Sequence, residues 1–486
     1  MRIPNDNNKV LIVGAGSSGI AAIKEALEVG LHPIAYEASS GVGGAWRYSS
    51  DPGDCQVRFD KQGWATFASP LESTSLVPPP SPMYDSLKTN VPTSLMRYRG
   101  SQFPPEVGLF ASHSQVQAYL ENYAHPLESC IRYNHRVTRI RYTTSEDEGE
   151  QRKWFAEIAP TDGSAVINEQ FDFVMIANGH YSKPFVPFTE GLRTWKGELQ
   201  HARWYRNTKA FENKTVLVVG NSASGYDITR EIAMSIHSRR TSDRPPATLP
   251  KIYQSARSTS NLGIPFDAPD SPDWAKEVKV FPPIRKVEDK TITFQDGSSL
   301  DNVDTIIYAT GYYFSFPFLH STDAPWSSHP VVRPPPTPDS SGDSTSPVDG
   351  GLRLHNLDDR FLFYLPDPSA VFLCLPYLVI PFPLAQLQAR LASLHFADSP
   401  QLPSPLEFVA GVSEDEPETR SSVVLGHPRQ YDLMDRMMRE SGDDASDDQE
   451  EDGDLVEADN KYGKTSQAER DLRGGAKALR RAVLGY

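Results

Sequence analysis

The sequence predicts an α/β protein with two Rossmann-like dinucleotide-binding domains, the second inserted into the first. Three observations support this prediction. A glycine-rich turn at residues 14–19 follows a short apolar run and precedes a helical stretch, and the same order recurs around residues 220–225. Two other apolar runs, 171–179 and 303–312, each lead into a glycine turn, and we interpret them as the crossings between the domains.

The first glycine-rich turn, Gly14-Ala-Gly-Ser-Ser-Gly19, has the surroundings that dinucleotide binding requires. Strand Lys9–Val13 precedes it, and a helix over 20–29 and a second strand over 33–36 follow. The first glycine permits a tight turn, the second lets the backbone approach a pyrophosphate, and the third lets the helix pack closely on the strand. At the end of the second strand, Glu37 can accept hydrogen bonds from ribose hydroxyls.

The next segment, Gly41-Val-Gly-Gly-Ala-Trp-Arg-Tyr48, combines paired glycines with a large aromatic side chain. This composition suits a backbone pressed against a flat, polar cofactor, and a surface loop with Trp46 as a packing anchor is the alternative. The candidate residues of the first dinucleotide site are Gly14, Gly16, Ser17, Gly19, Glu37, Gly44 and Trp46.

The second glycine-rich turn, Gly220-Asn-Ser-Ala-Ser-Gly225, departs from the pattern because its central glycine is replaced by Ser222. Serine is small enough to allow the same close approach of a pyrophosphate. A strand over 214–219 precedes the turn, and a helix over 226–234 and a strand over 251–254 follow. This unit therefore predicts a second dinucleotide site.

The strand over 251–254 is followed by Ser255 and Arg257 and not by an acid. An acid at this place favours the bare 2′-hydroxyl of NAD, whereas Arg and Ser suit the 2′-phosphate of NADP. We therefore expect NADP, with a solvated surface charge as the alternative interpretation of Arg257. The candidate residues of the second site are Gly220, Ser222, Ser224, Gly225, Ser255 and Arg257.

These units divide the chain into four stretches. Residues 1–185 form the first part of the first dinucleotide-binding domain, residues 186–300 the inserted NADP-binding domain, and residues 301–440 the second part of the first domain. Within the last of these, a proline-rich loop at 325–347 is expected to run over the surface. Residues 441–486 form a charged tail, acidic and then basic, which we expect to be disordered.

The composition excludes several classes of protein. With 48 Lys+Arg against 63 Asp+Glu, the formal net charge of −15 disfavours nucleic acid as a partner. Cys55, Cys130 and Cys374 lie far apart, so we expect no disulfide framework, no metal site and no dithiol redox centre. The polar N-terminal residues lack the apolar core of a signal peptide, and a reducing compartment, the cytoplasm, fits best.

The most apolar segment, residues 370–385, comes near the length of a membrane helix, but Pro376, Pro381 and Pro383 interrupt it. We therefore expect a buried strand followed by a loop and a helix, and no membrane span.

Four spaced segments resemble the flavin-containing monooxygenases, of the soluble fungal or yeast-like type. The most diagnostic is Trp195-Lys-Gly-Glu-Leu-Gln-His-Ala-Arg-Trp-Tyr-Arg206, which resembles the family's identifying sequence Phe-x-Gly-x-x-x-His-x-x-x-Tyr/Phe-Lys/Arg with Trp in place of Phe. The others are Gly14–Gly19, Gly43-Gly44-x-Trp46 and Gly220–Gly225. The resemblance runs from about residue 9 to about residue 395 and does not include the tail.

Two shorter segments extend the resemblance. Tyr84-Asp-Ser-Leu-Lys-Thr-Asn90 is similar to the family's segment with a flavin-facing asparagine, and Ala309-Thr-Gly-Tyr312 is similar to a later motif. The resemblance thus adds Asn90 as the catalytic candidate that orients the flavin peroxide and the nicotinamide, and Thr310 and Gly311 as cofactor contacts. Residues 177–179, Ala-Asn-Gly, replace the more usual Ala/Cys-Thr-Gly, a small polar change that should keep the turn.

The resemblance implies an enzyme of the N,N-dimethylaniline monooxygenase type that uses FAD, NADPH and dioxygen. NADPH reduces the flavin, dioxygen forms a C4a-hydroperoxide on it, and one oxygen atom passes to a soft nitrogen or sulfur atom of a small organic substrate. His201 is expected to pack in the hinge between the domains and not to carry a proton. The sequence leaves open whether the chain forms a homodimer and which substrate it takes.

Two other functions stay open. A Baeyer–Villiger ketone monooxygenase has similar domains, but its identifying sequence ends in Trp-Pro/Asp where this chain has Tyr205-Arg206. A flavin-binding scaffold without catalysis is disfavoured by the intact first turn and by Asn90. Flavin disulfide reductases do not fit because the chain has no Cys-x-x-Cys.

The substrate cavity is expected between the two domains, partly capped by residues 312–318 and 375–378. These segments are apolar and aromatic and contain no cluster of acids. The expected substrate is therefore an uncharged or weakly basic amine or thioether.

Overall fold

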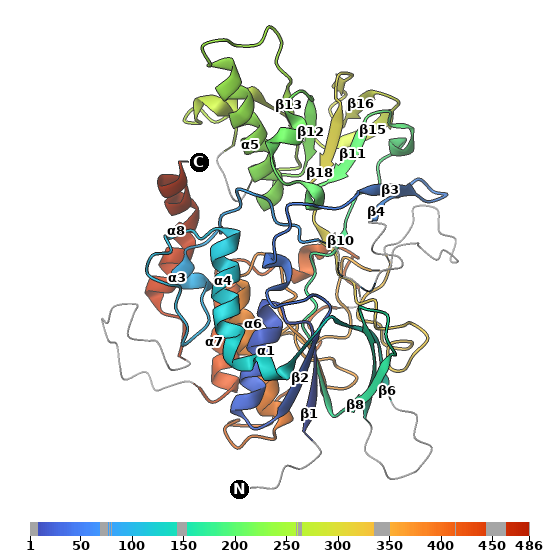
Figure 1. Cartoon of the computed structure of the whole chain (residues 1–486), viewed down its shortest axis with the longest axis vertical. Helices are drawn as coiled ribbons and strands as arrows, with labels where there is room; N and C mark the ends of the chain where they lie inside the picture. Colours follow the sequence, from blue (N-terminus) through green and yellow to red (C-terminus); the bar gives the residue numbers. More distant parts are fainter. Residues whose placement is uncertain are drawn as a thin grey trace.

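The computed structural model of the chain consists of two α/β units that lie one above the other (Figure 1). The lower unit contains both the blue N-terminal and the orange C-terminal parts of the chain, and the upper unit contains the green and yellow middle part. The fold class is therefore confirmed as two dinucleotide-binding units, the second inserted into the first. The structure describes residues 8–68, 76, 78, 80–142, 153–258, 260, 265–334, 350–413, 415–443 and 463–485.

The lower unit is built on a five-stranded parallel sheet with the order β20-β9-β1-β2-β5. Alternate side chains of its central strand face different layers, because successive residues of a strand point to opposite faces. Val10 and Ile12 pack against helices, whereas Leu11 and Val13 pack against a second, antiparallel sheet. The strands are β1 (Lys9–Val13), β2 (His32–Glu37), β5 (Ile131–Tyr133), β9 (Phe173–Ile176) and β20 (Ala370–Phe372).

In Figure 1 the helices of the lower unit lie to the left of β1 and β2, and the antiparallel sheet lies to the right. Helix α1 follows the first glycine-rich turn and packs along α6. The helices are α1 (Ser17–Glu28), α3 (Thr93–Met96), α4 (His113–Ala124), α6 (Pro381–Phe396) and α7 (Arg429–Glu440). The antiparallel strands are β6 (His135–Tyr142), β7 (Trp154–Pro160) and β8 (Ile167–Phe171).

The upper unit repeats this plan around a parallel sheet with the order β11-β18-β12-β13-β14. Val216 and Val218 pack against α5 (Ala223–Arg240), and Leu217 packs on the other face against the small sheet β15-β16-β17. The parallel strands are β11 (Glu198–His201), β12 (Val216–Val219), β13 (Ile252–Ser255), β14 (Val278–Phe281) and β18 (Thr305–Tyr308). The small sheet consists of β15 (Ile284–Glu288), β16 (Thr291–Phe294) and β17 (Ser299–Leu300).

The predicted domain boundary at residue 300 is wrong, because β18 lies inside the upper sheet. It pairs with β11 on one side and β12 on the other. The chain leaves the upper unit only after Tyr308, where β19 (Tyr312–Tyr313) pairs antiparallel with β10 (Lys183–Pro184) on the way in. An apolar run followed by a glycine turn looks the same in either unit, and only long-range strand pairing decides to which sheet it belongs.

A short hairpin of the lower unit reaches the upper one. It is formed by β3 (Gln56–Phe59) and β4 (Ala65–Ala68), and Phe67 packs in the core that contains Trp195 and Trp204. The tryptophan that replaces the family's phenylalanine is therefore a core residue at the junction of the two units.

Part of the predicted disordered tail is a helix. Residues 467–484 form α8 (Gln467–Leu484), which begins with a capping box between Ser466 and Glu469 and ends at Gly485 in a left-handed conformation. Its buried residues, Ala476 and Arg480, lie on one side of the helix. The net charge of the segment concealed this amphipathic pattern, and residues 444–462 of the predicted tail lie outside the described residues.

The proline-rich loop begins in the core and not on the surface. Trp326 is 2% exposed, and its indole N–H donates a hydrogen bond to the Ile140 carbonyl. A bulky aromatic anchor of this kind cannot be recognised from proline content alone. Positions 335–347 of the predicted loop lie outside the described residues.

The apolar segment 370–385 forms β20, a loop and the start of α6, as predicted. Among the residues that the structure describes, no helix combines the length and the apolar character needed to cross a membrane.

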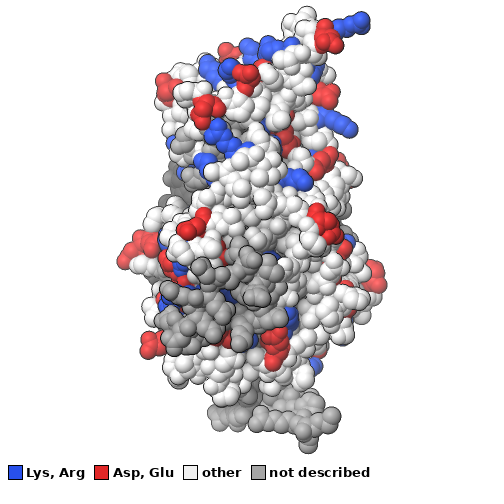
Figure 2. Space-filling model, turned by 90° about the vertical axis from the view of Figure 1, so that its left-hand side faces the viewer, with Lys and Arg blue, Asp and Glu red and all other residues white. Residues whose placement is uncertain are grey.

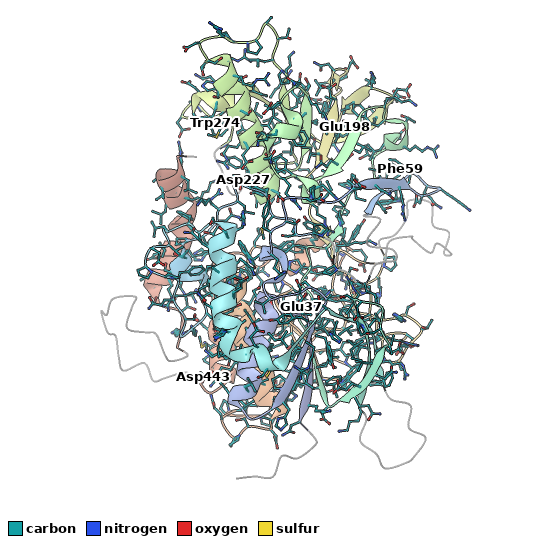
Figure 3. All side chains as sticks on the ribbon, viewed as in Figure 1. Glu37, Phe59, Glu198, Asp227, Trp274 and Asp443 are labelled. Atoms are coloured by element: carbon teal, nitrogen blue, oxygen red, sulfur yellow. The ribbon has the colours of Figure 1, made fainter. Side chains whose placement is uncertain are left out.

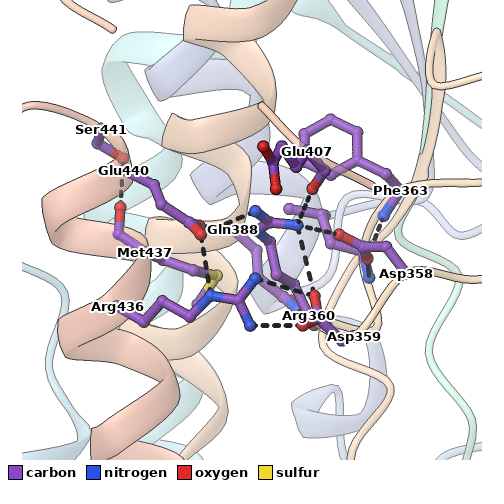
Figure 4. A network of polar contacts seen from close by, with 11 residues as sticks. Asp358, Asp359, Arg360, Phe363, Gln388, Glu407, Arg436, Met437, Glu440 and Ser441 are labelled. Atoms are coloured by element: carbon purple, nitrogen blue, oxygen red, sulfur yellow. Dashed lines mark hydrogen bonds and ion pairs between the residues drawn. The ribbon is translucent and has the colours of Figure 1, made fainter. Parts of the chain in front are cut away.

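A buried network of charges fixes α7 to the lower unit (Figure 4). The Arg360 guanidinium donates to Glu440 on α7 at 2.7 and 2.8 Å and to Asp358 at 2.8 Å. Asp358 is fully buried and also accepts from the main-chain N–H groups of Leu362 and Phe363. Burial raises the pKa of Asp358, so its ionised form depends on these donors.

We predict that Arg360→Ala destabilises the fold by about 3–5 kcal/mol, because it leaves the buried carboxylate of Asp358 without its counter-charge. Arg436 is the matched control, since it binds Asp359 and Glu440 of the same network but its side chain is 35% exposed. Arg436→Ala should cost about 1 kcal/mol or less. The midpoints of urea unfolding measure both effects, and equal shifts would contradict the prediction.

Candidate functional site

A cavity of about 1350 Å³ lies between the two units, at the carboxyl ends of both parallel sheets. This is the place where open α/β sheets bind their ligands. Most of the predicted site residues line it, and they come from both units. The lining includes Gly14, Gly16, Ser17, Glu37, Gly44, Trp46, Asn90, Gly220, Ser222, Ser224, Ser255, Arg257, Thr310 and Gly311.

The other two predicted residues, Gly19 and Gly225, lie behind the lining, where helix and strand meet. A Cβ atom on Gly19 would be 1.9 Å from the Gly14 carbonyl oxygen, and one on Gly225 would be 2.2 Å from the Gly220 oxygen. Each is the third glycine of its turn. They act through packing, as the sequence pattern predicts for this position.

The turn at the start of α1 forms a narrow cradle of backbone. Gly14 has φ +95°, and a Cβ atom on it would approach the Ala177 oxygen to 3.0 Å. Gly16 faces Gly44, whose Cα lies 3.5 Å from the place of a Gly16 Cβ. No side chain caps α1, so its first N–H groups are left for a ligand. The cradle fits the pyrophosphate of a dinucleotide.

Glu37 stabilises this turn from the end of β2. It is 8% exposed, and its carboxylate accepts from the Ala15 N–H and the Ser39 N–H, both at 2.8 Å, and from the Ser39 hydroxyl at 2.6 Å. A carboxylate has about four acceptor positions, so one stays free for a ribose hydroxyl. In Figure 3 Glu37 lies where β2 approaches the gap between the units.

The second turn repeats the first. Gly220 has φ +105°, and its Cβ would lie 2.6 Å from the Ala309 oxygen, just as Gly14 faces Ala177. Ser222 occupies the N-cap of α5 without a capping hydrogen bond from its side chain. The substitution of serine for the central glycine therefore preserves the cradle.

The two residues predicted to bind a 2′-phosphate, Ser255 and Arg257, lie in different environments, one buried and one exposed. Ser255 is 1% exposed, and its hydroxyl donates to the Pro282 carbonyl at 2.9 Å, which commits it to the protein. Arg257 is exposed at the cavity and pairs with no carboxylate within the described part of the chain. Of the two, the arginine is the residue free to meet a phosphate.

The segment that carries Asn90 is held by the upper unit. The Tyr84 hydroxyl donates to Asp227 on α5 at 2.6 Å, and the Asp85 N–H donates to the Arg206 carbonyl at 2.9 Å. Figure 3 places Asp227 on α5, near the lower edge of the upper unit. Asn90 follows this anchor and lines the cavity in a half-buried position.

Arg206, the last residue of the diagnostic segment, joins several loops. Its guanidinium donates to the carbonyls of Ser49 and Ser81 at 2.7 Å and to those of Arg203 and Tyr205 at 3.0 and 2.9 Å. The arginine of this motif therefore acts by cross-linking backbone, and its five N–H donors suit that role.

His201 packs between the units. Its Nε2 lies 3.1 Å from the Gly311 carbonyl oxygen, and its Nδ1 accepts from the Arg203 N–H at 3.2 Å. Burial lowers the pKa of His201 to about 3, so the ring is neutral at physiological pH. These contacts support the expected structural role in the hinge.

The lining is strongly basic in a protein of net charge −15. It includes one acid, Glu37, and seven Lys or Arg side chains: Arg47, Lys88, Arg136, Arg203, Arg257, Arg420 and Arg473. Over the outer face in Figure 2, by contrast, charges of both signs are interspersed. A positive cavity attracts the phosphates of dinucleotides. Of these seven, only Arg257 has a role predicted from the sequence. Arg47, Lys88 and Arg203 lie inside the quoted segments but had no predicted role, and Arg136, Arg420 and Arg473 lie outside every motif.

Comparison with known proteins identifies the fold and the family. Residues 7–67, 79–245 and 270–327, more than half of the chain, match the family model described as FMO-like, flavin-binding monooxygenase-like. The chain belongs to this family. It is a flavin-dependent monooxygenase that uses FAD and NADPH, and the two cradles described above fit these two cofactors.

Named relatives of the monooxygenase come from fungi and plants. A thiol-specific monooxygenase of Saccharomyces cerevisiae is 30% identical over 80% of this chain and 76% of its own length. The flavin-containing monooxygenase FMO GS-OX-like 2 of Arabidopsis thaliana is 28% identical over 88% of this chain and 81% of its own. Among solved structures, S-allyl-L-cysteine S-oxygenase from Allium sativum superposes with a TM-score of 0.67 at 22% identity, covering 98% of this chain and 93% of its own.

We predict that Gly16→Val yields folded protein that lacks FAD. The added side chain would occupy the cradle opposite Gly44, while its Cβ makes only ordinary contact with protein atoms. Gly108→Ala is the control, because a Cβ there meets nothing within 4 Å. Flavin absorbance per protein measures the effect, with circular dichroism as the check of folding. A Gly16→Val protein with full flavin content would place the cofactor elsewhere.

Proposed function

We propose that the monooxygenase oxygenates a soft nitrogen or sulfur atom of a small organic molecule. In the net reaction NADPH supplies two electrons as a hydride. One atom of dioxygen enters the product. The other atom leaves as water, whose two hydrogens come from the hydride and from a proton of the medium. The observation that supports this proposal most directly is the single cavity lined by both glycine-rich turns, because it allows the two cofactors to meet.

We assign FAD to the lower cradle and NADPH to the upper one. Bound FAD supplies the flavin that is reduced by NADPH and then activates dioxygen. Gly19 and Gly225 support the cradles from behind. The FAD contacts are Gly14, Gly16, Ser17, Glu37, Gly44 and Trp46, and the NADPH contacts are Gly220, Ser222, Ser224, Arg257, Thr310 and Gly311.

Asn90 is the proposed catalytic residue. Its carboxamide can donate and accept at once, which suits a group that orients both the nicotinamide and the oxygen-bearing side of the flavin. Because Tyr84 anchors its segment to α5 of the NADPH unit, the position of Asn90 depends on how the two units are joined. Aromatic side chains of Tyr312 and Tyr377 line the same cavity and would limit the entry of water.

A Baeyer–Villiger reaction on ketones is the second candidate. The main sequence argument against it is Tyr205-Arg206, but these residues take no part in the reaction itself. A screen with thioethers, tertiary amines and cyclic ketones, read by substrate-dependent oxygen uptake and product mass, separates the two. N- or S-oxides support the proposal. Esters or lactones without any N- or S-oxide would contradict it.

We also propose that the monooxygenase works in the cytoplasm. Cys130 and Cys374 carry free thiols, which suits a reducing compartment. The homodimer stays a prediction, and light scattering on the purified holoenzyme measures it.

For coenzyme choice, we predict that Arg257→Ala raises the Michaelis constant for NADPH about ten- to a hundredfold, the value of one charge-assisted contact. The Michaelis constant for NADH should change little, because NADH lacks the 2′-phosphate. Arg257→Lys should restore part of the preference. Equal losses with both coenzymes would assign Arg257 a structural role.

For Asn90, we predict uncoupling of NADPH oxidation from product formation. Asn90→Ala should still consume NADPH but release more hydrogen peroxide and less oxygenated product, because the reacting groups are no longer held together. The ratio of peroxide to product per NADPH measures this. Asn168→Ala, on the exposed part of β8, is the matched control. An unchanged ratio in Asn90→Ala removes this residue from the site.

A further inference from the structure

Two polar side chains in the aromatic part of the cavity lack the partners that their burial requires. His180 follows the Gly179 turn, is 6% exposed and lines the cavity. Neither of its ring nitrogens has a hydrogen-bond partner among the described residues. Its neighbours are the rings of Tyr181, Phe314 and Tyr377, with centroids 4.5, 5.4 and 4.8 Å away.

Arg420 is the second side chain. It starts a short 3₁₀ helix, Arg420–Val423, and its guanidinium donates to the carbonyls of Thr310 and Tyr312 at 2.8 and 2.7 Å. Its planar group also lies over the rings of Phe185 and Tyr377, at 4.7 and 5.6 Å from the centroids. These contacts hold it firmly in place in the lining of the cavity.

The charge of Arg420 is nevertheless uncompensated. Its Nε is buried without an acceptor, and within the described part of the chain no carboxylate forms an ion pair with it. Burial lowers the pKa of Arg420, but a guanidinium stays protonated at any physiological pH. A partly buried cation that makes hydrogen bonds only to carbonyls is stabilised when an anion from outside the chain binds beside it.

His180 and Arg420 face the same place. Both contact the ring of Tyr377, and the positive charge of Arg420 adds to burial in lowering the pKa of His180 to about 3. The imidazole is therefore neutral and can donate one N–H to an acceptor. A cation and a neutral N–H donor set among aromatic rings match a carboxylate attached to an otherwise apolar molecule.

We propose that Arg420 and His180 form a subsite that binds the carboxylate of the substrate, so that the monooxygenase takes acidic thioethers, thiols or amines. This inference rests on the proposed N- or S-oxygenation and names the substrate class for it. An acidic substrate replaces the uncharged or weakly basic one expected from residues 312–318 and 375–378. The reason is that Arg420, from a distant part of the sequence, lines the same cavity.

A phosphate of NADPH offers similar chemistry, and Arg257, the proposed partner of its 2′-phosphate, lies close enough for its charge to help lower the pKa of Arg420. The glycine-rich turns supply uncapped helix ends for the phosphates, whereas Arg420 is surrounded by Phe185, Tyr312 and Tyr377. Capture of a coenzyme anion by Arg420 is therefore the competing outcome of the test.

The test uses the holoenzyme and the pair 3-(methylthio)propanoate and its methyl ester, which share the sulfur atom and differ in charge. Wild-type enzyme should bind the acid more tightly than the ester by calorimetry and oxygenate it with a higher kcat/KM. In Arg420→Met the ratio of the two kcat/KM values, acid over ester, should fall about ten- to a hundredfold. Arg439→Met, an exposed arginine on α7 outside the cavity, should keep the wild-type ratio.

Because Arg420 also holds two carbonyls, His180→Phe provides a second variant that keeps the ring and removes the N–H. It should lower the same ratio, and flavin content confirms that each variant is folded. The coenzyme is tested separately by the rate of flavin reduction against NADPH concentration in the absence of substrate. If Arg420→Met impairs the reaction with NADPH more than the reaction with the acid, the arginine serves the coenzyme and the proposal is overturned.

Two further outcomes also overturn it. A wild-type enzyme that binds the ester as tightly as the acid has no carboxylate subsite, even if both are oxygenated, and the proposed N- or S-oxygenation would then stand without it. A parallel loss of both activities in Arg420→Met and in His180→Phe would assign the two residues to the architecture of the cavity. Formation of esters or lactones from ketones alone would instead refute the oxygenation chemistry itself.

Discussion

The position of the site depends on one guanidinium, that of Arg206, which joins backbone from separate parts of the chain. It donates four hydrogen bonds to carbonyl groups, among them those of Ser49 and Ser81 in the lower unit. A buried carbonyl without a donor is costly, so these loops and the segment before Asn90 are fixed together. The gap between the sheets is therefore defined by polar contacts and not by apolar packing alone.

The cavity is an exception to the charge of the rest of the protein. An acidic chain with a basic interior cleft attracts phosphate-bearing cofactors into the cleft, while its outer charges of both signs give it no broad basic field on the face in Figure 2. The low polarity of the aromatic part of the cavity strengthens the electrostatic interactions of every charge placed within it. One arginine is enough to recognise an anion there, provided that no carboxylate of the protein forms an ion pair with it.

The sequence predicted the parts of this structure that depend on neighbouring residues. Gly14 and Gly220 require a positive φ, which is a local demand, and the residues around them therefore identify both turns. The sheet to which β18 belongs, the helix within the charged tail and the burial of Trp326 all depend on contacts between distant segments. Arg420 could not be found for the same reason, because no motif surrounds it and its role follows from Tyr377 and Thr310. The cofactor contacts and the role of Asn90 stay predictions.

Helix α8 connects the two units at their edge (Figure 1). Arg470 binds Asp432 and Asp435 on α7 of the lower unit, and Arg480 binds Asp227 on α5 of the upper unit in a pair that is 4% exposed on each side. Dissolved ions screen a buried pair only weakly, whereas they screen exposed pairs strongly. The contact of α8 with the upper unit, which the Arg480–Asp227 pair makes, should therefore be insensitive to the ionic strength of the surroundings.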